Sequence, residues 1–335
     1  MVRAAGISME KAGEVLSAPT ALARELDEEM ALAQSSGAEI VTLNHPLYPG
    51  ILLESSDPPP VLYCKGRLEL LGRPSVAVVG TRRATDYGLA AAEAFSKELA
   101  AAGVTVVSGL AAGIDSAAHR AALDGPGGTL AVLGGGLARV YPRENVRLAE
   151  KIGERGLLVS EFSMSRGPER HHFPRRNRII AGLSLGVLVA EAPEISGAMI
   201  TARLAAEEGR EVFALPGPYR SQRSAGPHRL IREGASLVRS VDDILKEIFS
   251  LLNRFHPGVM IHLAGPAGPA GGAGAPAAFA PEEAAVLEGL DHAPVHIDRI
   301  ASRSRMGPGE ISRALLELEM KGAVRAMPGK MYART

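Results

Sequence analysis

Basic and aromatic side chains are concentrated in the segment Phe173–Ser184, which reads FPRRNRIIAGLS. A helix starting near Pro174 would place Arg175 and Arg178 on one face and turn Ile179 towards a core. Arginine binds phosphates through paired hydrogen bonds, and an aromatic ring can stack on a base, so the segment holds both ingredients of single-strand binding. The same residues are equally consistent with a solvated helix that has a core phenylalanine.

Two glycine-containing loops could add an anion site. The first is Gly80-Thr81-Arg82-Arg83 and the second is Ser108–Asp115, SGLAAGID; each follows a short apolar run and precedes a predicted helix. Glycines let backbone N–H groups approach an anion, and a helix N-terminus adds partial positive charge. Neither loop has the G-x-G-x-x-G dinucleotide pattern, and the chain has no G-x-x-x-x-G-K-[ST] motif. We therefore predict an anion site and no cofactor.

A catalytic or metal-binding role is weighed for Asp115 and three histidines. Asp115 opens a predicted helix, where aspartate is a favoured N-cap, and capping is the preferred interpretation. His119 lies one turn later and is predicted to be a hydrogen-bonded structural histidine. His171 and His172 would face opposite ways in an extended chain. Because spacing suggests no third ligand, we predict no metal site and no catalytic residue.

Two further loops are expected at the same sheet edge. Ser196-Gly197, before Thr201, predicts a helix start that could present hydroxyl or amide donors. Pro216-Gly217 follows the last predicted core strand.

The pattern around these loops predicts an α/β fold. Short β-branched apolar runs alternate with alanine-rich helical segments, which is typical of βαβ units and a buried, mostly parallel, doubly wound sheet. Ligands usually bind such sheets outside the carboxyl ends of the strands. The predicted strands are Ser75–Gly80, Val104–Ser108, Thr129–Leu133, Leu157–Ser160, Leu185–Glu191 and Glu211–Leu215.

Four regions are predicted along the chain. Residues 1–60 form a short helical N-terminal region with a proline-rich approach, and residues 61–252 an extended Rossmann-like domain. Residues 264–280 carry no charge and few bulky side chains, so a flexible linker is expected.

Residues 281–335 are predicted to form a small winged-helix domain. Ile311, Leu315 and Leu318 recur at helical spacing, and two short strands are expected around Pro328-Gly329. Three helices are expected before these strands. The third contains Arg313 but also Glu310 and Glu317, so the sequence leaves open whether this domain contacts DNA or has a docking or structural role.

Charge is distributed unevenly in a chain of zero net charge. Residues 1–60 hold nine acidic and three basic side chains, a net of −6, whereas residues 139–178 hold ten basic and five acidic, a net of +5. The second stretch is a local basic region of the kind that binds a polyanion.

The chain has one cysteine, Cys64, so an intramolecular disulfide is excluded. Cys64 is predicted to be a buried, reduced thiol. Without an apparent signal peptide or membrane span, the chain is predicted to be cytoplasmic.

Several motifs in order resemble the DNA-processing protein A (DprA/Smf) family, from about residue 40 to the end. They are GTRRATDYG (80–88), SGLAAGIDSAAH (108–119), YPREN (141–145), SEF (160–162), FPRRNRIIAGLS (173–184), SGAMITARLAAEEGREVFALPG (196–217) and LIREGA (230–235).

The resemblance implies a non-enzymatic protein that binds and protects single-stranded DNA and helps load RecA recombinase over single-strand-binding protein during natural transformation. It also implies a homodimer. The DNA-binding positions that it implies are Gly80, Thr81, Arg82, Arg83, Ser108, Gly109, Gly113, Phe173, Arg175, Arg176, Asn177, Arg178, Ser196, Gly197 and Thr201.

Three departures from the family pattern matter. Ala112 stands where many relatives have a basic residue, His228 stands where asparagine is common, and the N-terminal helical domain is expected to be truncated. The alternative function is a nucleotide phosphoribohydrolase-type enzyme. Such enzymes carry PGGxGTxxE, and the glycine runs Gly125–Gly128 and Gly134–Gly136 lack its Thr and Glu.

Overall fold

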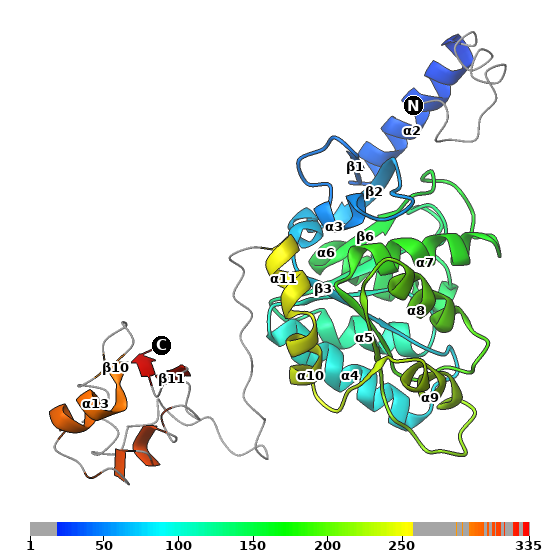
Figure 1. Ribbon diagram of the computed structural model, residues 1–335. Coiled ribbons are helices and arrows are strands. Elements are labelled where there is room, and N and C mark those ends of the chain that lie inside the picture. Colours follow the sequence, from blue (N-terminus) through cyan, green and yellow to red (C-terminus); the bar gives the residue numbers. More distant parts are fainter. Residues whose placement is uncertain are drawn as a thin grey trace. The chain divides into compact units, whose positions relative to one another are not determined.

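The computed structural model describes residues 19–256 and, further on, residues 286, 290, 295–304, 307, 310, 311, 313–315, 318, 324–327 and 331–334 (Figure 1). The chain divides into two compact units, Met1–Pro266 and Ala267–Thr335. The linker predicted over residues 264–280 lies outside the described part. Among the described helices, none has both the length and the apolar character needed to cross a membrane.

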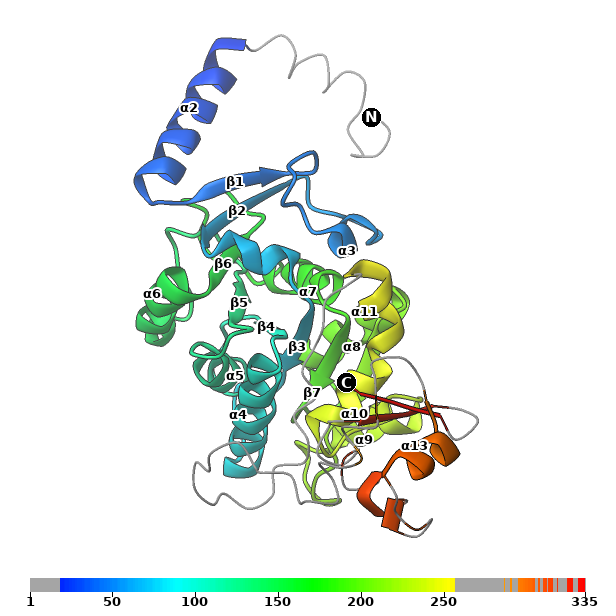
Figure 2. The same cartoon turned by 90° about the vertical axis from the view of Figure 1, so that its left-hand side faces the viewer.

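A nine-stranded sheet organises the first unit, in the order β1-β2-β6-β5-β4-β3-β7-β8-β9 (Figure 2). Neighbouring strands from β6 to β9 are parallel, which confirms the predicted doubly wound α/β class, and β2 pairs antiparallel with both β6 and β1. The strands are β1 Glu39–Thr42, β2 Val61–Gly66, β3 Ser75–Val79, β4 Thr105–Ser108, β5 Thr129–Val132, β6 Leu157–Ser160, β7 Gly186–Val189, β8 Glu211–Ala214 and β9 Ser236–Leu237.

The six strands predicted from β-branched runs are all present, within one or two residues at each end. The interpretation of residues 1–60 as helical was incomplete, because β1 lies in this region and extends the sheet through β2. The edge strand β1 and its neighbour β2 are only partly buried and lack the continuous apolar run of a central parallel strand.

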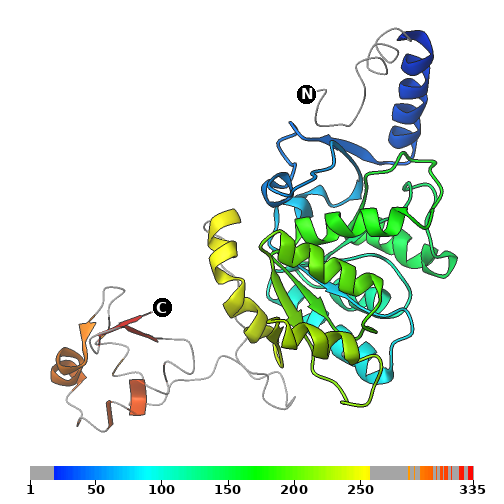
Figure 3. The ribbon, with the colours of Figure 1, turned by 45° about the vertical axis from the view of Figure 1, so that its right-hand side comes forward.

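Helices cover both faces of this sheet. On one face α7 and α8 lie side by side (Figures 1 and 3), and on the other lie α4, α5 and α10. The longer helices and helical turns are α2 Pro19–Ser35, α3 Gly50–Leu53, η2 Leu68–Gly72, α4 Asp86–Ala101, α5 Ile114–Ala122, η3 Arg143–Asn145, α6 Val146–Arg155, α7 His172–Leu183, α8 Gly197–Glu207, α9 Ala225–Arg232, α10 Val241–Glu247 and α11 Phe249–Phe255.

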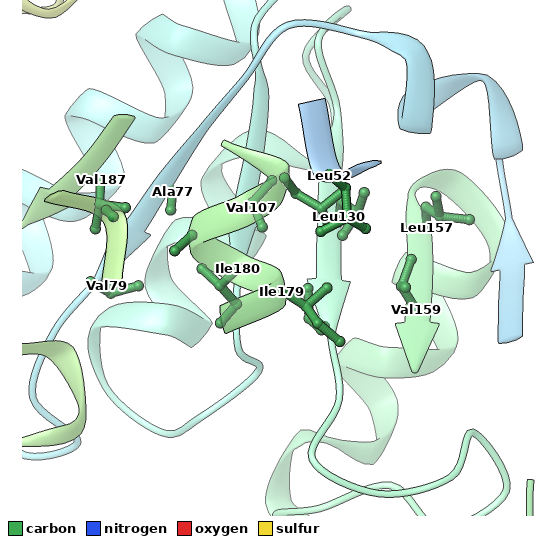
Figure 4. Close-up of a cluster of buried hydrophobic side chains, with 14 of the residues drawn as sticks. Leu52, Ala77, Val79, Val107, Leu130, Leu157, Val159, Ile179, Ile180 and Val187 are labelled. Atoms are coloured by element: carbon green, nitrogen blue, oxygen red, sulfur yellow. The ribbon is translucent and has the colours of Figure 1, made fainter. Parts of the chain in front are cut away.

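Alternate residues of each strand point to opposite faces of the sheet. Their burial beneath the helices stabilises the helix positions. Ile179 and Ile180 of α7 pack against Val79, Val107 and Leu130 of the sheet (Figure 4). Each fully buried aliphatic side chain contributes about 1.5–3 kcal/mol through removal of its surface from water. The predicted direction of Ile179 is confirmed, and α7 is therefore packed against the sheet through this face.

Cys64 is buried in the same core, as predicted, and burial raises the pKa of its thiol to about 12. The thiol is therefore protonated at neutral pH, which is the inert form.

The second unit has a three-stranded sheet in the order β10-β12-β11, with β10 Val295–His296, β11 Val324–Met327 and β12 Met331–Arg334. Strands β11 and β12 pair antiparallel, which confirms the predicted hairpin. Ile311, Leu315 and Leu318 are buried with Ile300 of α13 (Ile297–Ser304), as their spacing predicts. These features agree with a winged-helix domain.

Candidate nucleic-acid interface

A hollow of about 380 Å³ lies where the strand order reverses. Strand β3 has β4 on one side and β7 on the other, so the loops after β3 and β7 leave the sheet in opposite directions. A crevice at such a switch point is the usual ligand site of an open α/β sheet. The hollow is lined by Val79, Gly80, Thr81, Arg82, Arg83, Ala111, Asp115, Phe173, Arg176, Asn177, Ile180, Pro193, Ser196, Gly197, Ala198 and Thr201.

Most residues that sequence reasoning selected for DNA binding meet in this hollow. They come from the loop after β3, the start of α7 and the start of α8, which are distant in sequence. Gly109 lines a second hollow of about 200 Å³, which shares Arg82, Phe173 and Arg176 with the first. Ser108, Gly113, Arg175 and Arg178 are absent from the lining of both hollows.

Arg82 and Arg83 are the exposed cations of the first hollow. The Arg82 guanidinium carbon lies 5.5 Å from the centre of the Phe173 ring, a cation–π distance. Within the described residues, neither arginine has a carboxylate within ion-pair distance. Their charges are therefore available to an external anion.

Phe173 lies half-buried between the two hollows. A Cβ on Gly134 would come within 2.9 Å of the Phe173 ring, so the glycine lets the ring pack directly on the backbone after β5. Tyr141, 46% exposed, also lies beside Phe173, with ring centroids 5.8 Å apart and the rings tilted by 52°. Gly134, from one of the two glycine runs compared with the phosphoribohydrolase motif, therefore makes room for the Phe173 ring.

The start of α8 supplies a third component. Ser196 caps this helix, since its Oγ accepts a hydrogen bond from Met199 N at 3.4 Å, as the Ser196-Gly197 pair predicts. Asn177 Nδ2 donates to Gly197 O at 3.3 Å and so ties α7 to this helix end. The positive end of an eleven-residue helix therefore faces the same hollow as Arg82.

Arg176 is a buried support of the hollow. Its Nη1 donates to Gly109 O at 2.7 Å and also to Val132 O, and its Nε donates to Asn177 Oδ1 at 3.2 Å. Desolvation lowers the pKa of Arg176 to about 10, which leaves the guanidinium charged at neutral pH. The side chain joins α7 to the ends of β4 and β5.

Arg175 and Arg178 form a separate cluster on α7. Arg178 Nη2 lies 2.5 Å and Arg175 Nη2 3.1 Å from Oε2 of Glu161, whose side chain is 3% exposed. Arg178 Nε also lies 3.1 Å from Asp57 Oδ2. The expectation that these two arginines share a face is confirmed, and that face is occupied by carboxylates.

Asp115 does not cap its helix, contrary to the sequence-based preference. Gly113 precedes the first turn of α5 and is its N-cap, and Asp115 lies inside that turn. Its Oδ2 accepts hydrogen bonds from Gly109 N at 3.1 Å and Ala111 N at 3.4 Å, so it orders the preceding loop instead. Burial raises the pKa of Asp115, against the lowering effect of Arg176 and of these two amides.

Gly113 explains a close approach between the two glycine loops. Its φ is +78°, and a Cβ there would lie 2.4 Å from Thr81 O. Ile114 N donates to that carbonyl at 3.3 Å. A glycine at this position is required for the loops after β3 and β4 to touch.

His119 is a structural histidine, as predicted. Leu110 N donates to its Nε2 at 3.3 Å, and its Nδ1 lies 2.7 Å from Thr129 Oγ1, whose hydroxyl donates to Val106 O. Nδ1 therefore carries the proton and donates to Thr129. Burial lowers the pKa of His119 to about 3.

The same network holds Leu110, a buried residue with φ of +56°, and thereby the segment that carries Tyr141. Asn145 Nδ2 donates to Leu110 O and to Ser116 Oγ, both at 2.8 Å. A positive φ is strained for a residue other than glycine, and it persists only where surrounding contacts hold the backbone in place. Tyr141 is thus fixed beside Phe173 by contacts that no local pattern in the sequence indicates.

His171 and His172 do not face opposite ways, because the chain here begins α7 and is not extended. Their rings make a T-shaped contact with centroids 4.5 Å apart, and with Glu169 they form a group whose ligand atoms lie within 4.8 Å of one another. These atoms have internal partners. Glu169 N donates to His172 Nδ1 at 3.3 Å, and the Glu169 carboxylate lies 2.6 Å from Arg166.

Comparisons with known proteins agree with this architecture. The family model for DNA recombination-mediator protein A matches residues 39–249, and the DprA winged helix domain matches residues 270–330. Protein Smf of Escherichia coli is 38% identical over 325 residues, covering 97% of this chain and 84% of that protein. The DNA processing protein DprA of Streptococcus pneumoniae is 50% identical over 200 residues, covering 60% and 71%.

Two solved structures are similar in fold. DNA processing protein A from Streptococcus pneumoniae is 47% identical with a TM-score of 0.60, over 63% of this chain and 74% of that one. The protein from Helicobacter pylori, described for its single-stranded DNA binding mode, is 33% identical with a TM-score of 0.57, over 65% and 98%. Sheet order, tail domain and sequence identity over most of the length agree, and the chain belongs to the DNA recombination-mediator protein A family.

Proposed function

We propose that this chain binds single-stranded DNA in the hollow at the carboxyl ends of β3 and β7, with phosphates at Arg82 and Arg83 and a base at Phe173. The observation that carries the proposal is the Arg82–Phe173 pair, 5.5 Å apart and without a carboxylate partner among the described residues. A cation beside an aromatic face binds both parts of an unpaired nucleotide. The Helicobacter pylori relative, described for its single-stranded DNA binding mode, supports the choice of ligand.

The nearby arginines divide by their partners. Arg82 is proposed to carry most of the phosphate affinity, whereas Arg176 holds the site from behind, and Arg175 and Arg178 are paired with Glu161. A phosphate could bind Arg175 or Arg178 only in competition with the buried Glu161 carboxylate. Their contribution to DNA binding is therefore expected to be small.

A fluorescence anisotropy titration with single- and double-stranded oligonucleotides over a salt series tests the proposal. We expect a preference for single strands and a slope of log K against log salt of about −0.7 per phosphate contact. Arg82→Ala should weaken binding about 5- to 30-fold, and Phe173→Ala about 5- to 150-fold, from about 1–3 kcal/mol of stacking per base.

Arg120→Ala is the matched charge control, since Arg120 is exposed at the far end of α5. It should bind like the parent. Unchanged single-strand affinity in folded Arg82→Ala and Phe173→Ala variants would overturn the assignment of the site.

The wider role that we propose follows from family membership. The chain would protect single-stranded DNA and help load RecA recombinase over single-strand-binding protein in transformation, as a homodimer. Capture of RecA by the chain should survive Arg82→Ala, because partner contact and DNA contact are separate. Sedimentation of the full chain tests the dimer.

We also propose that the site performs no catalysis. The one carboxylate in the lining of the hollow, the buried Asp115, is engaged by two backbone amides and orders a loop. No free base should form from nucleoside monophosphates. Base release that Asp115→Asn abolishes would instead support the phosphoribohydrolase alternative.

A further inference from the structure

We propose that Glu191 is a positioning residue for DNA binding, because it holds the loop that carries Arg82 and Arg83. The inference rests on the proposed function and extends it to a residue that does not line the hollow of about 380 Å³. Its carboxylate would act on the bound strand only through residues 80–85, by fixing where the two arginines lie.

Glu191 lies beside the switch point of the sheet. It follows β7 by two residues, and its side chain is buried. Strand β7 pairs in parallel with β3, so the residues that follow the two strands leave the same edge of the sheet. The segment that contains Glu191 therefore adjoins the loop after β3.

Glu191 contacts this loop at both of its ends. At the first end, its backbone oxygen accepts a hydrogen bond from Thr81 N at 2.7 Å. At the second end, its Oε2 accepts from Thr85 N at 2.9 Å and its Oε1 accepts from Thr85 Oγ1 at 2.6 Å. The exposed Arg82 and Arg83 lie between these two attachments. One residue therefore fixes both ends of the segment that presents the two cations.

The hydroxyl of Thr85 links the Glu191 carboxylate to helix α4. Thr85 Oγ1 donates to Glu191 and accepts from Gly88 N at 3.2 Å, so the same hydroxyl also caps the helix. Gly88 leaves room for the carboxylate, since a Cβ at this position would overlap Glu191 Oε2. The partly positive start of a 16-residue helix adds to the stabilisation of the carboxylate. The end of β7, the loop and the helix start are thus joined at one side chain.

Burial makes this carboxylate dependent on the loop. Among the residues that the structure describes, no lysine or arginine lies within ion-pair distance of Glu191, and Thr85 supplies a donor to each carboxylate oxygen. A buried carboxylate has lost hydration that only such donors replace. The loop conformation that provides both donors is therefore favoured over other conformations. It is also the conformation in which Arg82 lies 5.5 Å from the centre of the Phe173 ring.

The direction of the effect of Glu191→Gln tests the proposal. This change removes a negative charge, so long-range electrostatics alone would strengthen binding of a polyanion. A glutamine amide has one acceptor oxygen and cannot accept from both Thr85 donors, so the loop should lose an attachment. In the anisotropy titration with a single-stranded oligonucleotide, the full-length variant should bind about 3- to 10-fold more weakly. The salt slope should fall by up to about 1.4, the value for two lost phosphate contacts.

Matched variants separate positioning from charge and from folding. Glu194→Gln removes the same charge from an exposed position three residues further along and should bind within about twofold of the parent. Thr85→Val replaces the hydroxyl by a methyl group and should weaken binding as Glu191→Gln does. Thr85→Ser keeps the hydroxyl and should bind like the parent. If Glu191→Gln does not fold, the two Thr85 variants decide the question.

Two further measurements show whether the effect passes through the arginines. Glu191→Gln added to Arg82→Ala/Arg83→Ala should change the affinity by no more than about twofold, because no cation remains to be positioned. Hydrogen exchange of the amides of residues 80–85 should be faster in Glu191→Gln than in the parent, whereas exchange in β5 should stay the same.

The outcomes distinguish this inference from the proposed function. Parent-like or tighter binding by Glu191→Gln, an equal loss in the Arg82→Ala/Arg83→Ala background, or unchanged exchange in residues 80–85 would each overturn the positioning role. Equal affinities of Thr85→Val and Thr85→Ser would overturn it too, and in all these cases the proposed site would stand. If Arg82→Ala and Phe173→Ala bind like the parent, the proposed function itself fails. Thermal unfolding of every variant shows whether it is folded in the titration.

Discussion

Arg176 donates hydrogen bonds from one guanidinium nitrogen to Gly109 O, at 2.7 Å, and to Val132 O. These carbonyls follow or end two adjacent strands, β4 and β5, so one side chain of α7 connects both to the helix that carries Phe173. The arginine is 5% exposed, and its role is to shape the hollow from beneath.

Arg176→Met should destabilise the fold by about 3–5 kcal/mol, because it leaves buried carbonyls without a donor and removes the cation that offsets Asp115. Arg175→Met, at the neighbouring exposed position, should cost about 1 kcal/mol or less. Urea unfolding of both variants measures the difference. Equal losses at the two positions would contradict the supporting role of Arg176.

The Arg178–Glu161 pair should be a stability element. Arg178→Met leaves the buried Glu161 carboxylate with only Arg175, and a loss of about 2–4 kcal/mol is expected. Adding Glu161→Gln removes the uncompensated charge, so the double variant should be more stable than Arg178→Met alone. A double-mutant cycle of unfolding free energies provides the measurement. Additive effects would show that the two side chains do not interact.

His119 should make the fold sensitive to acid. Its folded-state pKa of about 3 lies below the ordinary value of 6.5, so the unfolded chain binds the proton first as the pH falls. Stability from this residue is complete above pH 6.5 and is lost progressively towards pH 3, with a slope of up to about 1.4 kcal/mol per pH unit.

His119→Gln removes this titration. It should be less stable than the parent at pH 7, because hydrogen bonds to Leu110 and Thr129 are lost, yet its stability should decline less steeply between pH 6 and pH 4. Parallel pH profiles in guanidinium unfolding for the two proteins would show that His119 is not the titrating group.

The amino-acid sequence by itself determined the α/β class and the positions of the six central strands along the chain. Runs such as Val76–Val79 and Leu157–Val159 are apolar on both faces, which is typical of a strand that is covered on both sides. Ser196 and the Phe173 helix were recognisable from local chemistry. Local patterns suffice here because periodicity and capping depend on near neighbours in the chain.

Only the tertiary structure decided which of the recognised residues are available to a ligand. By sequence alone, Arg175 and Arg178 are as suitable for binding phosphate as Arg82. In the folded chain Glu161, which follows β6, pairs with both and neutralises their charges. Tyr141 meets Phe173 across 32 positions through the Asn145 anchor, and Asp115 orders a loop rather than capping α5. Long-range pairing selects among locally equivalent side chains, because burial and counter-charges are properties of the folded arrangement.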